Sequence, residues 1–430
     1  MLSVSQLLWL LLSFVVLTRY FKVIWASKSL PPGPVPFPFI GNLWTLGFKL
    51  HPQILTKLTE SYGNIYTIWL GETPLVVLNG CKAVKDGIVS HSDVLSGRPV
   101  ASLLKDLHRG RGIVMSNGDT WKQQRRFGMM TLRNLGLGNG ALESQIQEEA
   151  RCMVEQFRAK KGEPFDPSYI LNHAVANIIS ALVYGHRFSI EDVTFQELTN
   201  CTHCIVENIS SSWARSQNKE ASTFDEDNLI AVVIDLFGAG TETTAIALLW
   251  GLLYMVAYPD IQQEVQKELD ATSNGPQIYY KDRKNLPYTN AVIHEILRYG
   301  NIAAVGMPRT CTKNIKIRNY SLRKDTMVLA NLDSVLYDPQ YWKTPNQFNP
   351  QNFLDSDGNF LMNEAFMPFS AGSRVCLGEQ LARSEVFNFF STLMRSFSFQ
   401  LPEGVTEVNT KYIYKLTLQP HPFRICAVPR

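Results

Sequence analysis

A cysteine between two glycines in the C-terminal third of the chain is the residue best suited to chemistry. The segment reads Phe369-Ser370-Ala371-Gly372-Ser373-Arg374-Val375-Cys376-Leu377-Gly378 and leads straight into a predicted helix that ends near Arg395. Glycines on both sides let the backbone approach a flat ligand closely. The helix start offers unpaired N–H groups and a positive dipole end, which favour a thiolate over a thiol. We therefore expect Cys376 to act as an anionic metal ligand.

A second polar segment interrupts an otherwise apolar helix, predicted over residues 227–258 and ended by Pro259. It reads Ala239-Gly240-Thr241-Glu242-Thr243-Thr244. A glycine inside a helix costs up to about 1 kcal/mol relative to alanine, so Gly240 needs a reason, and close passage beside a bound group would supply one. A threonine hydroxyl beside a carboxylate can interrupt the helical hydrogen bonds and hold water.

Both segments resemble the cytochrome P-450 family. The cysteine loop matches the haem-binding pattern F-x-x-G-x-R-x-C-x-G at every fixed position, and residues 239–244 resemble the oxygen-activation motif. The residues 364–369 (EAFMPF) and 377–383 (LGEQLAR) are most similar to the microsomal family-two enzymes, closest to the vertebrate subfamily that epoxidises and hydroxylates polyunsaturated fatty acids. The resemblance implies a mainly α fold with small β-sheets, in which the haem lies between a long central helix and the cysteine loop.

The resemblance also assigns roles to individual residues. It makes Cys376 the axial ligand of the iron in heme b (iron protoporphyrin IX), where an anionic sulfur favours O–O cleavage. Glu242 and Thr243 become the acid and the alcohol that relay protons during oxygen activation. The further cofactor contacts that it implies are Ala239, Phe369 and Gly378. The residues that it implies for binding the two haem propionates are Arg98, Trp121, Arg125, Arg309 and Arg374. Trp121 and Arg125 are four residues apart and would share one helix face.

The pair Glu295 and Arg298 resembles the structural E-x-x-R motif of the family. In the family this pair is buried and locks the core against a later segment, which here reads Pro350-Gln351-Asn352-Phe353. The family usually has Arg or His where this chain has Asn352. A neutral amide can donate a hydrogen bond but adds no charge, which leaves the third arm of the network open to question.

The N-terminus predicts a single-pass membrane anchor. Residues 7–17 are apolar except for Ser13, a marginal length for a spanning helix, and the basic residues Arg19, Lys22 and Lys28 follow. By the positive-inside rule these charges keep the rest of the chain cytosolic, which for this family implies the endoplasmic reticulum membrane. We expect an anchor over residues 1–20, a basic and proline-rich linker over 21–40, and one haem-thiolate domain over 41–430.

The coarse pattern along the chain fits such a domain. Residues 65–70 and 75–78 read as a β-hairpin, and short strands are expected near residues 316–329. Further helices are predicted over 259–271 and 288–299.

Composition narrows the functional classes. Hydrophobic residues make up 45% of the chain and charged residues 18%, with a formal charge of +3, which does not favour nucleic-acid binding. Seven scattered cysteines indicate a reducing compartment rather than a disulfide framework. Cys201, His203 and Cys204 could suggest zinc, but no second ligand pair accompanies them, so a structural role is the better interpretation.

The stretch between Leu198 and Thr223 is short and polar where family members have two further helices that roof the substrate pocket. We expect an internal deletion near residues 199–222, and with it an incomplete roof that admits water to the distal side of the haem. The remaining pocket candidates are Val114, Ile234, Ala239, Ile302, Val305 and Ile413. They are apolar enough for a fatty acid, a steroid or a xenobiotic, with epoxidation or hydroxylation of an arachidonate-type lipid favoured by the resemblance.

Three functions follow from these features. The first is a monooxygenase that receives NADPH electrons through NADPH–cytochrome P-450 reductase, with cytochrome b5 as a possible second partner and Lys122, Arg126 and Arg133 as docking charges. The second is a catalytically impaired haem-binding form, a splice or degenerate variant that lacks the roof. The third is a peroxide isomerase of the same fold, which Glu242 and Thr243 disfavour because such enzymes have no use for a proton relay.

Overall fold

The computed structural model describes residues 3–99, 110–134, 141–193, 195–197, 225–272 and 277–430. The chain divides into two compact units. Unit 1 comprises Met1–Pro99, Ala304–Asp338 and Ser370–Val375, and unit 2 comprises Val100–Ala303, Pro339–Phe369 and Cys376–Arg430. The chain thus enters unit 1 for one short segment directly before Cys376.

Unit 1 is built on a four-stranded sheet with the strand order β1-β2-β6-β3. Strands β1 (Ile65–Leu70) and β2 (Thr73–Leu78) form the predicted antiparallel hairpin, with β2 starting two residues earlier than expected. β2 pairs in parallel with β6 (Met327–Ala330), which pairs antiparallel with β3 (Arg309–Thr310). The other elements of unit 1 are α2 (Pro52–Tyr62), α3 (Gly80–Val84), the π-helical turn η1 (Lys85–Val89), the 3₁₀ turns η2 (Val94–Ser96) and η5 (Gly372–Arg374), the hairpin β4 (Ile315–Ile317) and β5 (Tyr320–Leu322), and α12 (Asp333–Leu336).

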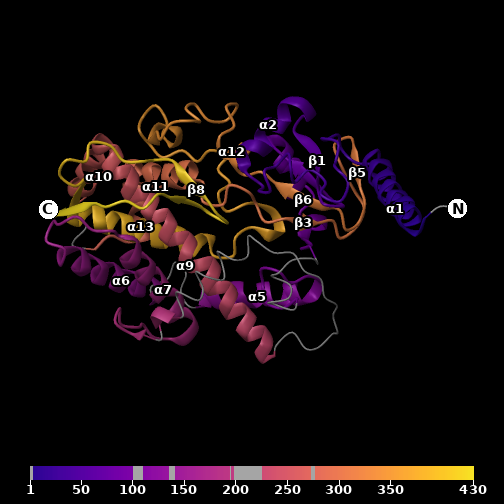
Figure 1. The fold of residues 1–430 in the computed structure, drawn as a ribbon. Helices are drawn as coiled ribbons and strands as arrows, with labels where there is room; N and C mark the ends of the chain where they lie inside the picture. The colour runs from indigo at the N-terminus through magenta and orange to yellow at the C-terminus, as the bar shows by residue number, and fades with distance from the viewer. Residues whose placement is uncertain (1–2, 100–109, 135–140, 194, 198–224, 273–276) are drawn as a thin grey trace. The chain divides into compact units, whose positions relative to one another are not determined.

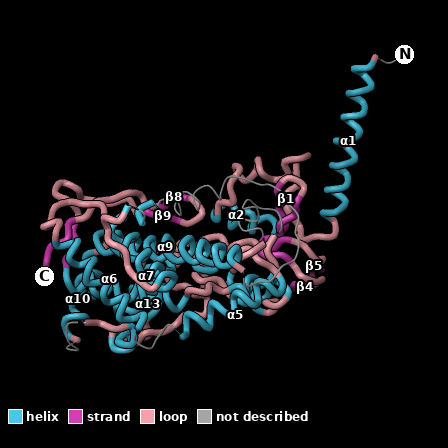
Figure 2. The backbone as a smooth tube through the Cα atoms, turned by 90° about the horizontal axis from the view of Figure 1, so that it is seen from below, coloured by secondary structure: helices cyan, strands magenta, loops and turns pink. Residues whose placement is uncertain are grey.

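Helix α1 (Val4–Ser27) begins unit 1 and runs without a break (Figure 2). The Ser3 hydroxyl caps its N-terminus by accepting a hydrogen bond from the Gln6 N–H. The side-chain carbonyl of Gln6 in turn accepts a hydrogen bond from the Ser3 N–H. Its side chains are apolar, yet none of them is buried. Of the described helices, only α1 and α9 are long and apolar enough to cross a membrane.

Unit 2 is mainly helical. Its helices and turns are α5 (Gly118–Asn134), α6 (Ala141–Arg158), α7 (Ser168–Tyr184), α9 (Glu226–Ala257), α10 (Pro259–Ala271), η3 (Tyr280–Asn285), α11 (Pro287–Gly300), η4 (Pro350–Phe353) and α13 (Glu379–Ser396). Two small antiparallel sheets complete it, β7 (Phe397–Gln400) with β10 (Cys426–Pro429) and β8 (Tyr412–Tyr414) with β9 (Leu418–Pro420). The expectation of a mainly α fold with small sheets is confirmed.

Helix α9 is the centre of unit 2. The Asp225 side chain caps it by accepting from the Asn228 N–H, and Pro259 ends it, so that the prediction of residues 227–258 is correct to within one residue at each end. Every residue from Thr244 to Val256 is buried, because α7, α11 and α13 pack around this part of the helix (Figure 1). α9 is therefore a core helix, whereas no residue of α1 is buried.

The other predicted elements of unit 2 also agree with the structure. α10 has the predicted bounds, α11 exceeds its prediction by one residue at each end, and α13 ends one residue later than expected. The predicted deletion near residues 199–222 and the cluster Cys201, His203 and Cys204 lie outside the described residues.

The packing of α13 against α9 buries a carboxyl group, that of Glu385. Glu385 is 1% exposed, Thr244 donates a hydrogen bond to it, and its Oε1 atom has no hydrogen-bond partner in the described part of the chain. Among the described residues, no Lys, Arg or His forms an ion pair with it. Burial raises the pKa of Glu385 to about 8, so the folded protein holds this group as a neutral acid at neutral pH.

This burial makes stability depend on pH. The native state keeps the Glu385 proton up to about pH 8, while the unfolded chain loses it in the ordinary glutamate range. The free energy of unfolding should therefore fall by about 1.4 kcal/mol per pH unit between about pH 5 and pH 8 from this group alone. Glu385→Gln should remove that slope in urea denaturation, whereas Glu403→Gln, at an exposed site, should keep it. Equal slopes for Glu385→Gln and the parent would contradict a buried neutral Glu385.

Candidate functional site

Cys376 lies three residues before α13 as an exposed residue whose sulfur is nevertheless desolvated by the surrounding protein, and its backbone is fixed. Its N–H donates to the Phe369 carbonyl oxygen at 3.0 Å, which closes the loop that both residues bound. Within unit 1, Gly372 has a φ of +72°, and a Cβ atom there would lie 2.1 Å from the Ile88 carbonyl oxygen. No side chain fits at residue 372, so this glycine is required for the path of the loop.

The electrostatics of Cys376 differ in part from the expectation. The surrounding protein desolvates the sulfur, and this desolvation raises the pKa of the thiol more than the neighbouring groups lower it. The backbone N–H groups of Gly378 and Glu379 and the charge of Arg125 lower the pKa, as predicted for a helix start. The helix terminus alone therefore does not outweigh desolvation, and coordination of the sulfur to a metal ion would lower the pKa of the thiol further.

Arg125 and Trp121 both lie on α5 in unit 2. Trp121 is buried, and burial lowers the pKa of Arg125 while the charge of Cys376 raises it. Arg125 is thus close enough to Cys376 for each to affect the ionisation of the other. The spacing of four residues puts Trp121 and Arg125 on one face of α5, as predicted.

Three predicted propionate ligands lie in unit 1, and all three are buried. Arg98 donates to the carbonyl oxygens of Met307 and Pro308 at 3.0 and 2.9 Å. Arg309 donates to the Ser370 hydroxyl at 3.1 Å and to the Ala371 carbonyl at 2.7 Å. The Nε atom of Arg374 donates to the Ser96 carbonyl at 2.7 Å. These bonds fix the three guanidinium groups against the backbone.

The predicted oxygen-activation residues form one turn of α9. Ala239 is exposed and Thr243 is partly accessible, although the helix around them is mostly buried. The Thr243 hydroxyl donates to the Ala239 carbonyl at 2.7 Å. The Glu242 carboxyl is buried, and its Oε1 atom accepts from Gln419 at 2.8 Å and from Thr417 at 3.2 Å. No sequence pattern indicates these two partners, which lie about 175 residues later, Gln419 on β9 and Thr417 directly before it.

Gly240 also lies close to a neighbouring helix. A Cβ atom at this position would lie 2.6 Å from the Cδ1 atom of Ile179 on α7. The glycine thus gives room to the Ile179 side chain, a contact that the sequence pattern does not indicate.

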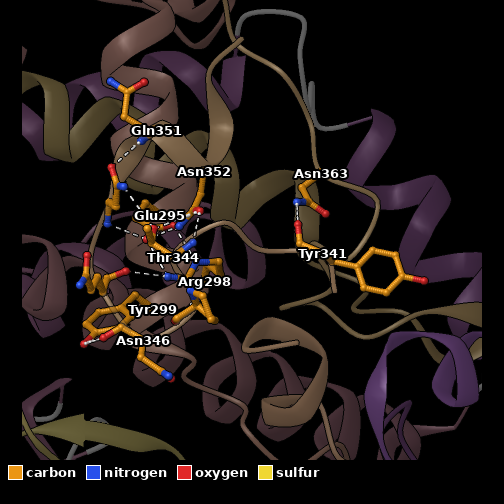
Figure 3. Close-up of polar contacts among 12 residues, drawn as sticks. Glu295, Arg298, Tyr299, Tyr341, Thr344, Asn346, Gln351, Asn352 and Asn363 are labelled. Atoms are coloured by element: carbon orange, nitrogen blue, oxygen red, sulfur yellow. Dashed lines mark hydrogen bonds and ion pairs between the residues drawn. The ribbon is translucent and has the colours of Figure 1, made fainter. Parts of the chain in front are cut away.

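The E-x-x-R pair is fully buried (Figure 3). Arg298 donates to Glu295 through Nε and Nη2, both at 2.7 Å, and its remaining donors reach the carbonyl oxygens of Pro345 and Gln347 at 2.9 Å. Burial raises the pKa of Glu295, and the Arg298 guanidinium acts in the opposite direction.

The third arm of this network is present. The Asn352 side-chain amide donates to Glu295 Oε1 at 3.1 Å, beside the Asn349 N–H at 2.8 Å. The Asn352 carbonyl oxygen in turn accepts from the Thr344 hydroxyl at 3.3 Å. A neutral hydrogen bond thus replaces the charge that the family usually supplies.

The predicted pocket residues are all accessible in part. Val114, Ile234, Ile302 and Ile413 of unit 2 and Val305 of unit 1 are partly exposed, and Ala239 is exposed. The structure adds Asp235, which sequence reasoning missed. This buried carboxylate on α9 accepts from the N–H groups of Ile113 (2.6 Å) and Val114 (3.0 Å), and so fixes the candidate Val114 to the long helix.

As a donor set these residues suit an iron porphyrin. A cysteine sulfur just before a helix start is a suitable ligand for iron, and arginine side chains are suitable partners for carboxylates such as the two that this cofactor carries. The family model described as cytochrome P450 matches residues 31–216 and 214–427.

The chain belongs to the cytochrome P450 family. Among its relatives are cytochrome P450 2J2 of Homo sapiens, with 36% identity over 94% of this chain and 92% of the relative, and cytochrome P450 2J5 of Mus musculus, with 37% identity over 94% and 92%. Cytochrome P450 2K4 of Oncorhynchus mykiss is 37% identical over 93% and 92%. The predicted placement with the family-two enzymes is confirmed, and membership supports a haem monooxygenase.

The buried network of Glu295 predicts a graded response to substitution. Arg298→Leu leaves a buried carboxylate without its cation and should lower the free energy of unfolding by about 3–5 kcal/mol. Asn352→Leu removes one neutral donor and should cost about 1–3 kcal/mol. Urea denaturation followed by circular dichroism measures both values. The matched control Arg158→Leu breaks an exposed pair with Glu155 and should change stability by at most about 0.5 kcal/mol. A larger loss for Asn352→Leu than for Arg298→Leu would contradict this ranking.

Proposed function

We propose that this chain is a haem-thiolate monooxygenase that inserts one oxygen atom from O₂ into a hydrophobic substrate, with electrons from NADPH. The observation that carries the proposal is the exposed residue Cys376 at the end of a backbone-fixed loop, in a chain of this family. When bound, heme b supplies the site of O₂ activation, and a thiolate ligand favours cleavage of the O–O bond. Arg98, Trp121, Arg125, Arg309 and Arg374 are proposed to hold its propionates, with Ala239, Phe369 and Gly378 as further contacts.

Glu242 and Thr243 are proposed to deliver protons. Gln419 and Thr417 hold the Glu242 carboxyl in one position, and Thr243 lies beside it on the accessible part of α9. A proton donor is effective only when it is positioned within hydrogen-bond reach of the group that it serves. The hydrogen bonds to Glu242 supply that positioning from the protein side.

The substrate is proposed to be a lipid of the arachidonate type, epoxidised or hydroxylated. The partly exposed apolar residues Val114, Ile234 and Ile302 offer no charged partner of their own, which suits a long apolar chain. The similarity to cytochromes P450 2J2 and 2J5 supports the placement in the fatty-acid subfamily that the sequence motifs indicated.

The electrons are proposed to come from NADPH–cytochrome P450 reductase, with cytochrome b5 as a second partner. Lys122, Arg126 and Arg133 are exposed on α5, the helix that also bears Trp121 and Arg125, and they are the proposed docking charges. The bare apolar surface of α1 supports a single-pass anchor in the endoplasmic reticulum membrane with the remaining chain in the cytosol.

A second candidate is a catalytically impaired haem-binding form. The two matched segments of the family model meet at residues 214–216, inside the predicted deletion. The alignment with cytochrome P450 2J2 spans 463 residues, whereas 94% of this chain is about 404 residues, so that about 59 alignment positions lack a residue here. Both observations support a shortened pocket roof, which would admit water to the site.

The spectrum of the reduced, carbon monoxide-bound protein tests the ligand. The full chain expressed with a haem precursor should give a thiolate-type Soret band, and Cys376→Ser should abolish it because serine supplies no sulfur. Cys152→Ser on α6 is the matched control and should leave the band unchanged. Persistence of the band in Cys376→Ser would disprove the assignment.

Activity then separates the two candidates. The reconstituted protein with reductase and arachidonate should consume NADPH and form epoxide or hydroxy products. A normal Soret band with no oxygenated product from any lipid would favour the impaired form.

A further inference from the structure

Arg383, on the second turn of α13, makes three kinds of contact at once. Its Nε and Nη2 atoms donate to Glu379 Oε1 at 3.0 and 2.9 Å. Its Nη1 atom lies 2.9 Å from the Nε2 atom of His294 on α11. The side chain is 17% exposed, so these contacts are largely shielded from water. A guanidinium is the one side chain with enough donors in a fixed plane to serve both partners.

The hydrogen bonds of His294 define its tautomer. Its Nδ1 atom lies 2.7 Å from the Asn290 carbonyl oxygen, which can only accept, so Nδ1 carries the proton. Arg383 can only donate, so Nε2 must accept. Burial and the nearby charge of Arg383 lower the pKa of His294 to about 3, which keeps the ring neutral at physiological pH. His294 is therefore a permanent acceptor for Arg383.

The guanidinium group of Arg383 also lies over the aromatic rings of Phe366 and Phe369. Its Cζ atom lies 5.2 Å from the ring centre of Phe366 and 5.0 Å from that of Phe369. The carbonyl of Phe369 accepts the N–H of Cys376 at 3.0 Å. A chain of contacts thus runs from His294 through Arg383 and Phe369 to the backbone of the sulfur ligand.

We infer that Arg383, oriented by His294 and Glu379, is a positioning residue for Cys376 and acts through Phe369. The inference rests on the haem-thiolate function proposed above. The cation–π contact fixes the ring of Phe369, and the fixed residue presents its carbonyl to the Cys376 N–H. Without Arg383, Phe369 can turn and the sulfur loses the backbone bond that holds it in place. Partners of this kind typically affect metal binding although they do not touch the metal.

The test uses the full chain expressed with haem and measures which fraction of the total haem gives a thiolate-type Soret band in the reduced carbon monoxide complex. In Arg383→Gln the ratio of thiolate-type to other haem should fall by about tenfold relative to the parent. Arg383→Lys keeps a positive charge for Glu379 but loses the planar group. Its ratio of thiolate-type to other haem should lie between those of Arg383→Gln and the parent. Arg158→Gln, which breaks an exposed pair of the same kind on α6, should match the parent.

Variants of His294 provide a second test in case Arg383→Gln does not fold. His294→Gln can donate to Asn290 and accept from Arg383, so it should retain the parent ratio. His294→Phe suits the aromatic surroundings of Phe353, Phe360 and Phe366 but offers no acceptor, and its ratio should fall.

Three results would overturn these assignments. A folded Arg383→Gln with the parent ratio contradicts the positioning role, and so does an equal ratio in His294→Phe and His294→Gln. A merely structural role for Arg383 would lower the yield of folded protein and leave the ratio per haem unchanged. Absence of the thiolate-type band from the parent protein would instead contradict the proposed function.

Discussion

The hydrogen bond from the Cys376 N–H to the Phe369 carbonyl is the constraint on which the site depends. A sulfur ligand must be accessible, yet an exposed loop of ten residues would ordinarily move. The loop meets both requirements because its backbone is tied at its ends, at Phe369 and Cys376, and because Gly372 passes too close to Ile88 for any side chain. Cys376 is left as an exposed residue three positions before α13 begins.

Unit 2 also contains buried carboxyl groups whose hydrogen bonds are specific. Glu295 is held by Arg298 and Asn352, Glu242 by Gln419 and Thr417, and Asp235 by two backbone N–H groups. Burying such groups is costly unless partners are in place, so each fixes one relative position of two segments far apart in sequence. The hydrogen bonds of Glu295, Glu242 and Asp235 therefore all follow from the same physical requirement.

Much of this arrangement could be predicted from the sequence. The bounds of α9 follow from an apolar run ended by Pro259, and the motif around Cys376 indicates the ligand without a structure. The partners Gln419, Asp235 and Arg383 could not be predicted, because their contacts join segments that no local pattern connects. The proximity of Gly240 to Ile179 could not be predicted for the same reason, since Ile179 lies on another helix. The pKa of Cys376 also escaped prediction, because desolvation by the folded protein outweighs the helix terminus.

The central claim is that the sulfur of Cys376 is bonded to the haem iron. Resonance Raman spectroscopy of the oxidised protein, grown with ordinary cysteine and with cysteine containing a heavy sulfur isotope, tests it most directly. The account predicts an iron–sulfur stretching band that moves to lower frequency with the heavy isotope and is absent from Cys376→Ser. A spectrum that is unchanged by the isotope, or a sensitive band that survives in Cys376→Ser, would contradict it.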